Sequence, residues 1–177
     1  MPLYHFSEEP DIRIFEPRAG RIADQAYVWA IDEWHAPMYY FPRDCPRACF
    51  WPGPQTTAED RERWFGGIDA RMFIAVESAW LDRIRSAQLY RYALPEDSFE
   101  LHDATAGHWV SHTAVVPFSV QPVEDLLTAL AEAGVELRIY ASADRPLVTR
   151  DRINIGVLRH TPAERRRLAG ERLTRGC

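Results

Sequence analysis

Short strand patterns follow one another along this chain with few helices between them, and this order constrains the fold most. Runs of apolar or alternating residues are separated by short segments rich in Pro, Gly and Asp. Consecutive strands that lack crossover helices favour antiparallel pairing. We therefore predict an α+β fold, with mainly antiparallel sheets and short flanking helices. The predicted strands span 3–6, 12–15, 26–31, 48–51, 72–76, 89–92, 98–101, 108–111, 114–119, 135–140 and 153–158.

Helices are predicted where a start signal precedes an apolar periodicity. The clearest has Pro122 in its first turn and Gly134 just past its end, a pairing typical of helix boundaries. Another follows the capping pattern Thr56-Thr57-Ala58-Glu59, and Gly66-Gly67 ends it. The predicted helices span 56–65, 78–84 and 123–133, with a short one after Asp32 and one beginning at Thr161.

Length and composition limit the class of protein. The 177 residues suit a single domain over 1–177, and 46% of them are hydrophobic, which is enough for a core. No apolar run approaches the roughly 18 residues of a membrane span, and the N-terminus is too polar for a signal peptide. Three cysteines are too few for a disulfide framework. A cytoplasmic protein without a membrane partner is the expectation.

Charge excludes some chemistry. The formal net charge is -5, so electrostatics gives no general reason to expect nucleic acid as a partner. All 21 cationic side chains are Arg. Without lysine, Schiff-base catalysis and the lysine of a phosphate-binding loop are both ruled out.

Three segments carry side chains that suit a small-molecule site. His5 lies on a short apolar strand, where it is either a hydrogen-bonded structural histidine or a ligand contact. Trp29 ends an aromatic strand and Tyr40 follows a polar turn, so their rings either pack in the core or enclose a flat heterocycle. Arg43 and Arg47 stand four apart in a proline-rich loop and bind either a phosphate or local carboxylates.

Two sets of side chains raise the alternative of a metal site. One comprises His102, Asp103, His108 and His112, because two histidines four apart on a strand share a face. The other comprises His35, Cys45 and Cys49, which lacks an evident fourth ligand. Glu136 and Arg138 also share a strand face, either as a solvated neighbour pair or as one wall of a pocket.

Much of the chain resembles a bacterial family of unknown function. The residues that carry the resemblance span 3–18, Val28–Asp32, Pro42–Arg47, Ala106–Ser111 and Val135–Arg138. The family implies no activity.

The opening Tyr4-His5-Phe6-Ser7 also resembles, more distantly, the first strand of the ADP-ribosyltransferase group. That group includes the poly(ADP-ribose) polymerases and DNA-modifying toxins. The resemblance implies that His5, with Ser7 beside it, contacts the adenine-side ribose of NAD. The second motif of the group has a tyrosine on a strand and another eleven residues later, whose rings flank nicotinamide. Here Trp29 and Tyr40 have that spacing, with Trp29 replacing the first tyrosine.

The third motif of the group is a glutamate just before an apolar strand, where it stabilises the positively charged transition state. Its position falls on Gly107, or on His108 if the register shifts by one. Neither is a carboxylate. RNA 2′-phosphotransferases, on a related fold, use NAD with His and Arg residues instead, and Arg43, Arg47 and Arg138 leave that variation open.

From these patterns we expect an NAD-binding, ADP-ribosyltransferase-like protein that transfers ADP-ribose to an unknown acceptor macromolecule. The expected catalytic residues are His5 and His108. A nucleotide-like small molecule, with NAD as cofactor, would be held by His5, Ser7, Trp29, Tyr40, Arg43 and Arg47, without a metal. One alternative is a non-catalytic nucleotide- or partner-binding module on the same fold, which the missing glutamate favours. The other is a metal-dependent hydrolase.

Overall fold

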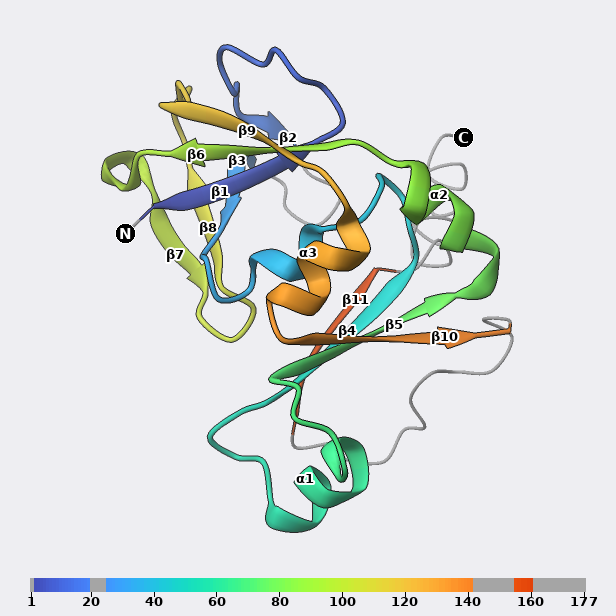
Figure 1. The fold of residues 1–177 in the computed structure, drawn as a ribbon. Helices are drawn as coiled ribbons and strands as arrows, with labels where there is room; N and C mark the ends of the chain where they lie inside the picture. The colour runs from blue at the N-terminus through green and yellow to red at the C-terminus, as the bar shows by residue number, and fades with distance from the viewer. Residues whose placement is uncertain (1, 20–24, 142–154, 161–177) are drawn as a thin grey trace, which may run out of the picture. The chain divides into compact units, whose positions relative to one another are not determined.

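The computed structural model describes residues 2–19, 25–141 and 155–160, and of 155–160 it describes the backbone alone. It divides the chain into two compact units, one formed by residues 1–43 and 82–135 and the other by residues 44–81 and 136–177. Each unit is built around its own sheet (Figure 1). The strand pairs whose register the structure describes are antiparallel, which confirms the predicted α+β class. The expectation of a single domain stays a prediction.

The first unit contains a seven-stranded sheet in the order β7-β8-β3-β1-β6-β9, with β2 paired to β3. Its strands are β1 (Leu3–Ser7), β2 (Arg18–Ala19), β3 (Ala26–Ile31), β6 (Leu89–Leu94), β7 (Glu100–Asp103), β8 (His108–Ser111) and β9 (Ser119–Val123). Its helices are α2 (Leu81–Ser86), α3 (Leu126–Glu132) and the 3-10 turns η1 (Ala36–Tyr39) and η3 (Glu96–Ser98).

One face of this sheet forms the core of the unit. Strand alternation directs Leu3, Ala30 and Tyr92 to the same side, where they join Phe15 and Val115 in one buried cluster. Phe15 and Val115 exchange backbone hydrogen bonds of 2.8 and 2.9 Å, which fixes two irregular segments over the sheet. The sheet is therefore covered on this side by loops of its own unit.

The second unit contains a four-stranded sheet in the order β10-β5-β4-β11. Its elements are β4 (Arg47–Pro52), α1 (Ala58–Phe65), β5 (Met72–Glu77), the 3-10 turn η2 (Ser78–Trp80), β10 (Val135–Tyr140) and β11 (Ile155–His160). The rings of Phe50 and Phe73 stack 4.5 Å apart, and Phe65 of α1 packs 5.2 Å from Phe73. Burial of these aromatic rings attaches α1 to the sheet.

Arg138 connects β10 to the same aromatic cluster. Its guanidinium lies 3.7 Å from the centre of the Phe73 ring and donates to the Trp64 carbonyl at 3.0 Å. It also donates to the Glu136 carboxylate at 2.8 Å. The neighbour pair predicted on this strand is thus present, and it is half-buried rather than fully solvated.

Several element predictions differ from the structure, among them the strand predicted over 98–101, which lies at Glu100–Asp103 after the 3-10 turn η3. Only Phe15 of the segment 12–15 pairs, in an isolated bridge with Val115. The strand predicted over 114–119 lies instead at Ser119–Val123, and the following helix begins at Leu126 after its cap, Asp125. Pro122 accounts for this difference, because β9 is an edge strand, where proline is tolerated as well as in a helix first turn. The last strand is described at Ile155–His160, and residues 153 and 154 of its predicted range lie outside the described residues.

The helix predicted from Thr161 and the loop predicted over 143–152 lie outside the described residues. Among the helices that the structure describes, none is long and apolar enough to cross a membrane.

Candidate functional site on the outer face of the sheet

The second face of the seven-stranded sheet, here called the outer face, carries most of the histidines of the unit. Along β3, Tyr27, Trp29 and Ile31 point to this face, opposite to Val28 and Ala30 in the core. Ile31 pairs with His108 on β8, so His108 shares the outer face. Residues that lie diagonally across these two strands, such as Trp29 and His108, therefore bring aromatic and imidazole rings together.

Six side chains form what we call the histidine–aromatic face: Tyr27, Trp29, Tyr39, His102, His108 and His112. The indole of Trp29 lies 5.0 Å from the His102 ring and 5.9 Å from the His108 ring, nearly perpendicular to both. His112 lies 4.9 Å from Tyr27. His102 and His112 are exposed and the other four are half-buried, so the rings remain accessible.

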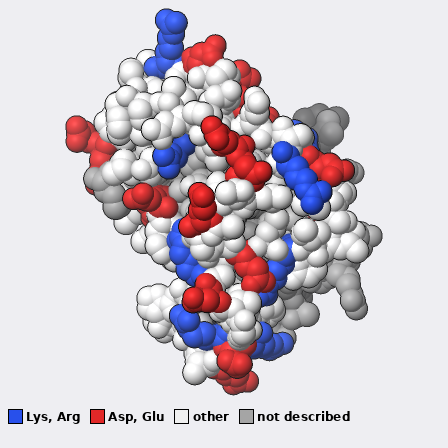
Figure 2. Space-filling model, viewed as in Figure 1, with Lys and Arg blue, Asp and Glu red and all other residues white. Residues whose placement is uncertain are grey.

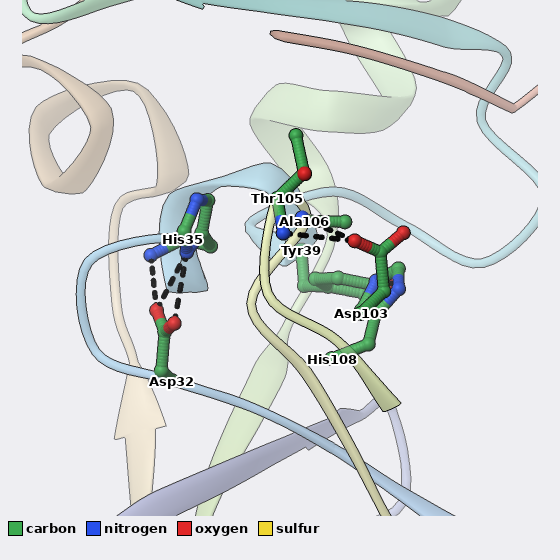
Figure 3. A network of polar contacts seen from close by, with 7 residues as sticks. All are labelled: Asp32, His35, Tyr39, Asp103, Thr105, Ala106 and His108. Atoms are coloured by element: carbon green, nitrogen blue, oxygen red, sulfur yellow. Dashed lines mark hydrogen bonds and ion pairs between the residues drawn. The ribbon is translucent and has the colours of Figure 1, made fainter. Parts of the chain in front are cut away.

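Tyr39 reaches this face from the 3-10 turn η1. Its hydroxyl and the Nε2 atom of His108 form a hydrogen bond of 2.9 Å (Figure 3). Pro37 near the start of η1 ends any longer helix after Asp32, so the chain turns and presents Tyr39 after one short turn. The bond joins side chains 69 residues apart in the sequence.

Asp32 and His35 hold the loop between β3 and η1 in place. The Asp32 carboxylate accepts hydrogen bonds from the His35 backbone N–H at 2.8 Å and from Nδ1–H of its ring at 2.8 Å. The Asp32 backbone N–H donates to the Gly107 carbonyl at 3.0 Å. These contacts tie the loop that carries Tyr39 to the turn before β8.

Gly107 is required by this packing. Its φ is +67°, a conformation that side chains disfavour, and an added Cβ would lie under 3.0 Å from His35 Nδ1 and Asp32 Oδ2. The position expected to carry the third-motif glutamate therefore has no space for a side chain in this conformation. His108, the alternative register, is the partner of Tyr39.

The turn between β7 and β8 is held by Asp103. Its Oδ1 atom accepts from the backbone N–H of Thr105 at 2.8 Å and of Ala106 at 3.1 Å (Figure 3). Burial is the largest influence on His108 and lowers its pKa, while the nearby carboxylates of Asp103 and Asp32 oppose that change. The hydrogen bonds from His35 outweigh burial at Asp32 and lower the pKa of that carboxyl.

Carboxylates predominate beside the histidine–aromatic face. Asp32 and Asp103 lie near His108, and Glu100 accepts a hydrogen bond from His112 Nε2 at 3.2 Å. Of the described arginines, Arg18 is opposite Tyr27 and so lies beside the β2 end of this face, whereas Arg91 is opposite Phe6, on another part of the outer face. The Arg91 guanidinium stacks over Tyr4 and donates to Gln121.

His5 and Ser7 lie on the core side of β1. His5 is opposite Tyr92, its ring is 4.7 Å from Phe15, and its Nδ1–H donates to the Trp29 carbonyl at 2.9 Å. Burial lowers the pKa of His5, and the charges of Arg43 and Arg18 add to that effect. Ser7 Oγ accepts from the Glu9 backbone N–H.

Tyr40 lies on the other side of β1, because its ring packs 5.3 Å from that of Phe6, the residue after His5. Of the predicted residues, Trp29, Tyr40 and His108 therefore share the outer face. His5 and Ser7 do not share it.

The two predicted arginines belong to different units. Arg43 belongs to the first unit, where it is exposed and its backbone N–H donates to Glu8. Arg47 belongs to the second unit, where it is buried and its Nη1 donates to the Cys45 carbonyl at 3.1 Å.

The described structure groups neither of the two predicted sets of metal ligands. Within the described ranges, no three His, Cys, Asp or Glu side chains are grouped as metal ligands would be. His102 and His108 surround Trp29 and His112 contacts Tyr27, so aromatic rings occupy the space between these histidines. Burial also raises the pKa of the Cys49 thiol to about 12, so this side chain is an uncharged thiol near neutral pH.

Tyr39 was not among the predicted cofactor-binding residues, and His35 was considered only as a metal ligand, not as the partner of Asp32. The Asp32-x-x-His35 spacing was a usable signal, because an aspartate can accept from a backbone N–H three residues later. The contact of Tyr39 with His108 had no local signal, since it depends on how distant strands pair.

Together the fold and this face define an α+β protein with an accessible set of histidine and aromatic rings on one side of an antiparallel sheet. Within that class, the chain belongs to a family of unknown function (DUF6886), whose model matches residues 4–157. No curated protein and no solved structure matches the chain.

Proposed function

We propose that this protein binds a nucleotide-like small molecule by its flat ring, on the histidine–aromatic face. The observation that carries the proposal is the gathering of Trp29, Tyr39 and His108 around one half-buried surface of the sheet. Aromatic side chains in ligand sites commonly supply stacking area, while a few polar groups fix orientation. Tyr39 and the histidines provide such polar groups here.

The proposal is for a binding module rather than a transferase. Gly107 leaves no room for the glutamate that ADP-ribosyl transfer uses in the resembling group. An NAD-dependent transferase is the second candidate, favoured by Trp29 and Tyr40 sharing one face at the spacing of the second motif. In a transferase, His5 would have to contact the ligand from the core side of the sheet.

The test is calorimetric titration with NAD, ADP-ribose and adenosine, with analysis of the mixture for released nicotinamide. Trp29→Leu keeps an apolar side chain and removes the ring, and we expect it to weaken binding about tenfold or more. Phe118→Leu is the matched control, because it removes a ring that is 64% exposed and lies beside β6, which β1 and β3 separate from β8.

His5→Asn separates the two candidates, since the asparagine amide can still donate to the Trp29 carbonyl. Binding that needs Trp29 but not His5, without nicotinamide release, supports the binding module. Binding that needs His5, with release, supports the transferase. If wild-type protein binds none of the three ligands, both candidates are wrong.

A further inference from the structure

We propose that the histidine–aromatic face selects a cationic ring, such as an N-alkylated heterocycle, over an uncharged ring of the same shape. The inference rests on the proposed function, because it specifies the charge of the ligand that this face would bind. Two independent features carry it: the aromatic rings that make up the face and the carboxylates that surround it.

The rings supply electron-rich surfaces. Tyr27, Trp29 and Tyr39 are half-buried, and each contacts a histidine ring on the same face. The face of an aromatic ring carries partial negative charge and attracts an organic cation, most strongly for tryptophan. Partial burial strengthens this attraction, because less water competes for the cation.

The carboxylates add long-range attraction for the same sign of charge. Asp103 is fixed by two backbone N–H donors, and Glu100 is fixed by His112. Asp32 is held by its two hydrogen bonds from His35. Burial disfavours the charged form of His108, so this imidazole adds little positive charge that would repel the ligand near neutral pH.

The arginines that could bind an anionic ligand group lie away from His108. Arg91 is stacked on Tyr4 and bonded to Gln121, on the β6 side of the sheet. Arg18 lies opposite Tyr27, at the end of β3 away from His108. The half of the face formed by Trp29, His102 and His108 is therefore bordered by acidic rather than basic side chains.

The experiment compares 1-methylquinolinium with quinoline, two flat rings of nearly the same shape that differ in charge at about pH 8. Affinities are measured by calorimetry at low ionic strength, and the site is confirmed with Trp29→Leu. We expect the cation to bind about three- to thirtyfold more tightly. Addition of salt should reduce this preference, because exposed carboxylates are screened.

Asp103→Asn and Glu100→Gln, made together, remove two charges. The asparagine oxygen can still accept from Thr105 and Ala106, so the turn is retained. We expect the double variant to lose most of the preference for the cation, while Glu132→Gln on α3 keeps it.

The outcomes are distinguishable. Equal binding of both rings overturns this inference and leaves the proposed function standing. A preference for the cation that persists unchanged in the double variant also overturns it, since the carboxylates would then have no part. If neither ring binds, and NAD, ADP-ribose and adenosine do not bind either, the inference and the proposed function are both overturned.

Discussion

At the scale of single residues, Gly107 shows how a missing side chain can be a structural requirement. Gly107→Ala would place a methyl group against His35 and Asp32 at a positive φ. We expect a loss of unfolding free energy of about 2 kcal/mol or more, combining backbone strain with displacement of the buried pair. Chemical denaturation followed by circular dichroism measures it.

Gly67→Ala provides the matched control. Gly67 also has a positive φ, of +79°, but nothing lies within 4 Å of an added Cβ. It should cost only the backbone term of about 1 kcal/mol. Equal losses in the two variants would show that the contacts with His35 and Asp32 do not constrain position 107.

His5 makes stability depend on pH. Its pKa is lowered in the folded protein, mainly by burial, so the unfolded chain binds more protons below the ordinary value of about 6.5. Stability is then highest above that pH and decreases as the pH falls towards the folded pKa. Denaturation at about pH 8 and pH 5.5 should show a smaller acid-induced loss for His5→Asn than for wild type.

Asp32 does not confuse this comparison. Its lowered pKa contributes stability that is lost only as the pH falls below the ordinary aspartate value of about 4. The two residues therefore act in separate pH windows. An identical acid-induced loss in wild type and His5→Asn would contradict the assigned role of burial at His5.

At the scale of elements, helix α3 begins at the cap Asp125, a start signal weaker in the sequence than Pro122. The Asp125 carboxylate accepts from the Thr128 backbone N–H at 2.7 Å, and Leu126 and Leu130 are buried behind it. Asp125→Ala should destabilise the protein by about 1 kcal/mol, whereas Asp125→Asn should retain most of the cap. Thermal unfolding compares them, and no difference between the two would contradict the observed helix start.

Most elements could be predicted because their signals are local. The mainly apolar segment 26–31 and the alternating segment 135–140 predicted β3 and β10 with the observed bounds. Local hydrogen bonds bound α1, since the Thr57 hydroxyl accepts from the Asp60 N–H and the Gly66 N–H donates to the Glu62 carbonyl. The failures lie where a signal has two meanings, as at Pro122, or where pairing is a single bridge, as at Phe15.

At the scale of the whole molecule, pairing between distant strands decided the site, and the sequence alone could not predict it. Trp29 and His108 were predicted as site residues, but their closeness depends on the pairing of β3 with β8. Alternation does place His5 and Phe6 on opposite faces, yet only the fold shows that Tyr40 packs on Phe6. That contact shows that the predicted site residues lie on two faces, with Tyr40 on one and His5 on the other.

Net charge leads to a further prediction for the intact protein. With a charge of -5, and with acidic and basic side chains interspersed on the face drawn in Figure 2, general affinity for a nucleic acid backbone is unfavourable. Fluorescence anisotropy of a labelled DNA duplex should not change up to about 10 μM protein in about 50 mM salt. Saturable, salt-sensitive binding in that range would contradict this expectation.

The perpendicular packing of histidine rings around Trp29 and Tyr27 also makes this surface visible to spectroscopy. Aromatic ring currents displace the imidazole proton resonances of His102, His108 and His112, and these resonances fall in an uncrowded region of the spectrum. With only 6 histidines in the sequence, few such signals compete. A molecule that binds to this side of the sheet would therefore shift these imidazole resonances in a proton spectrum of the unlabelled protein.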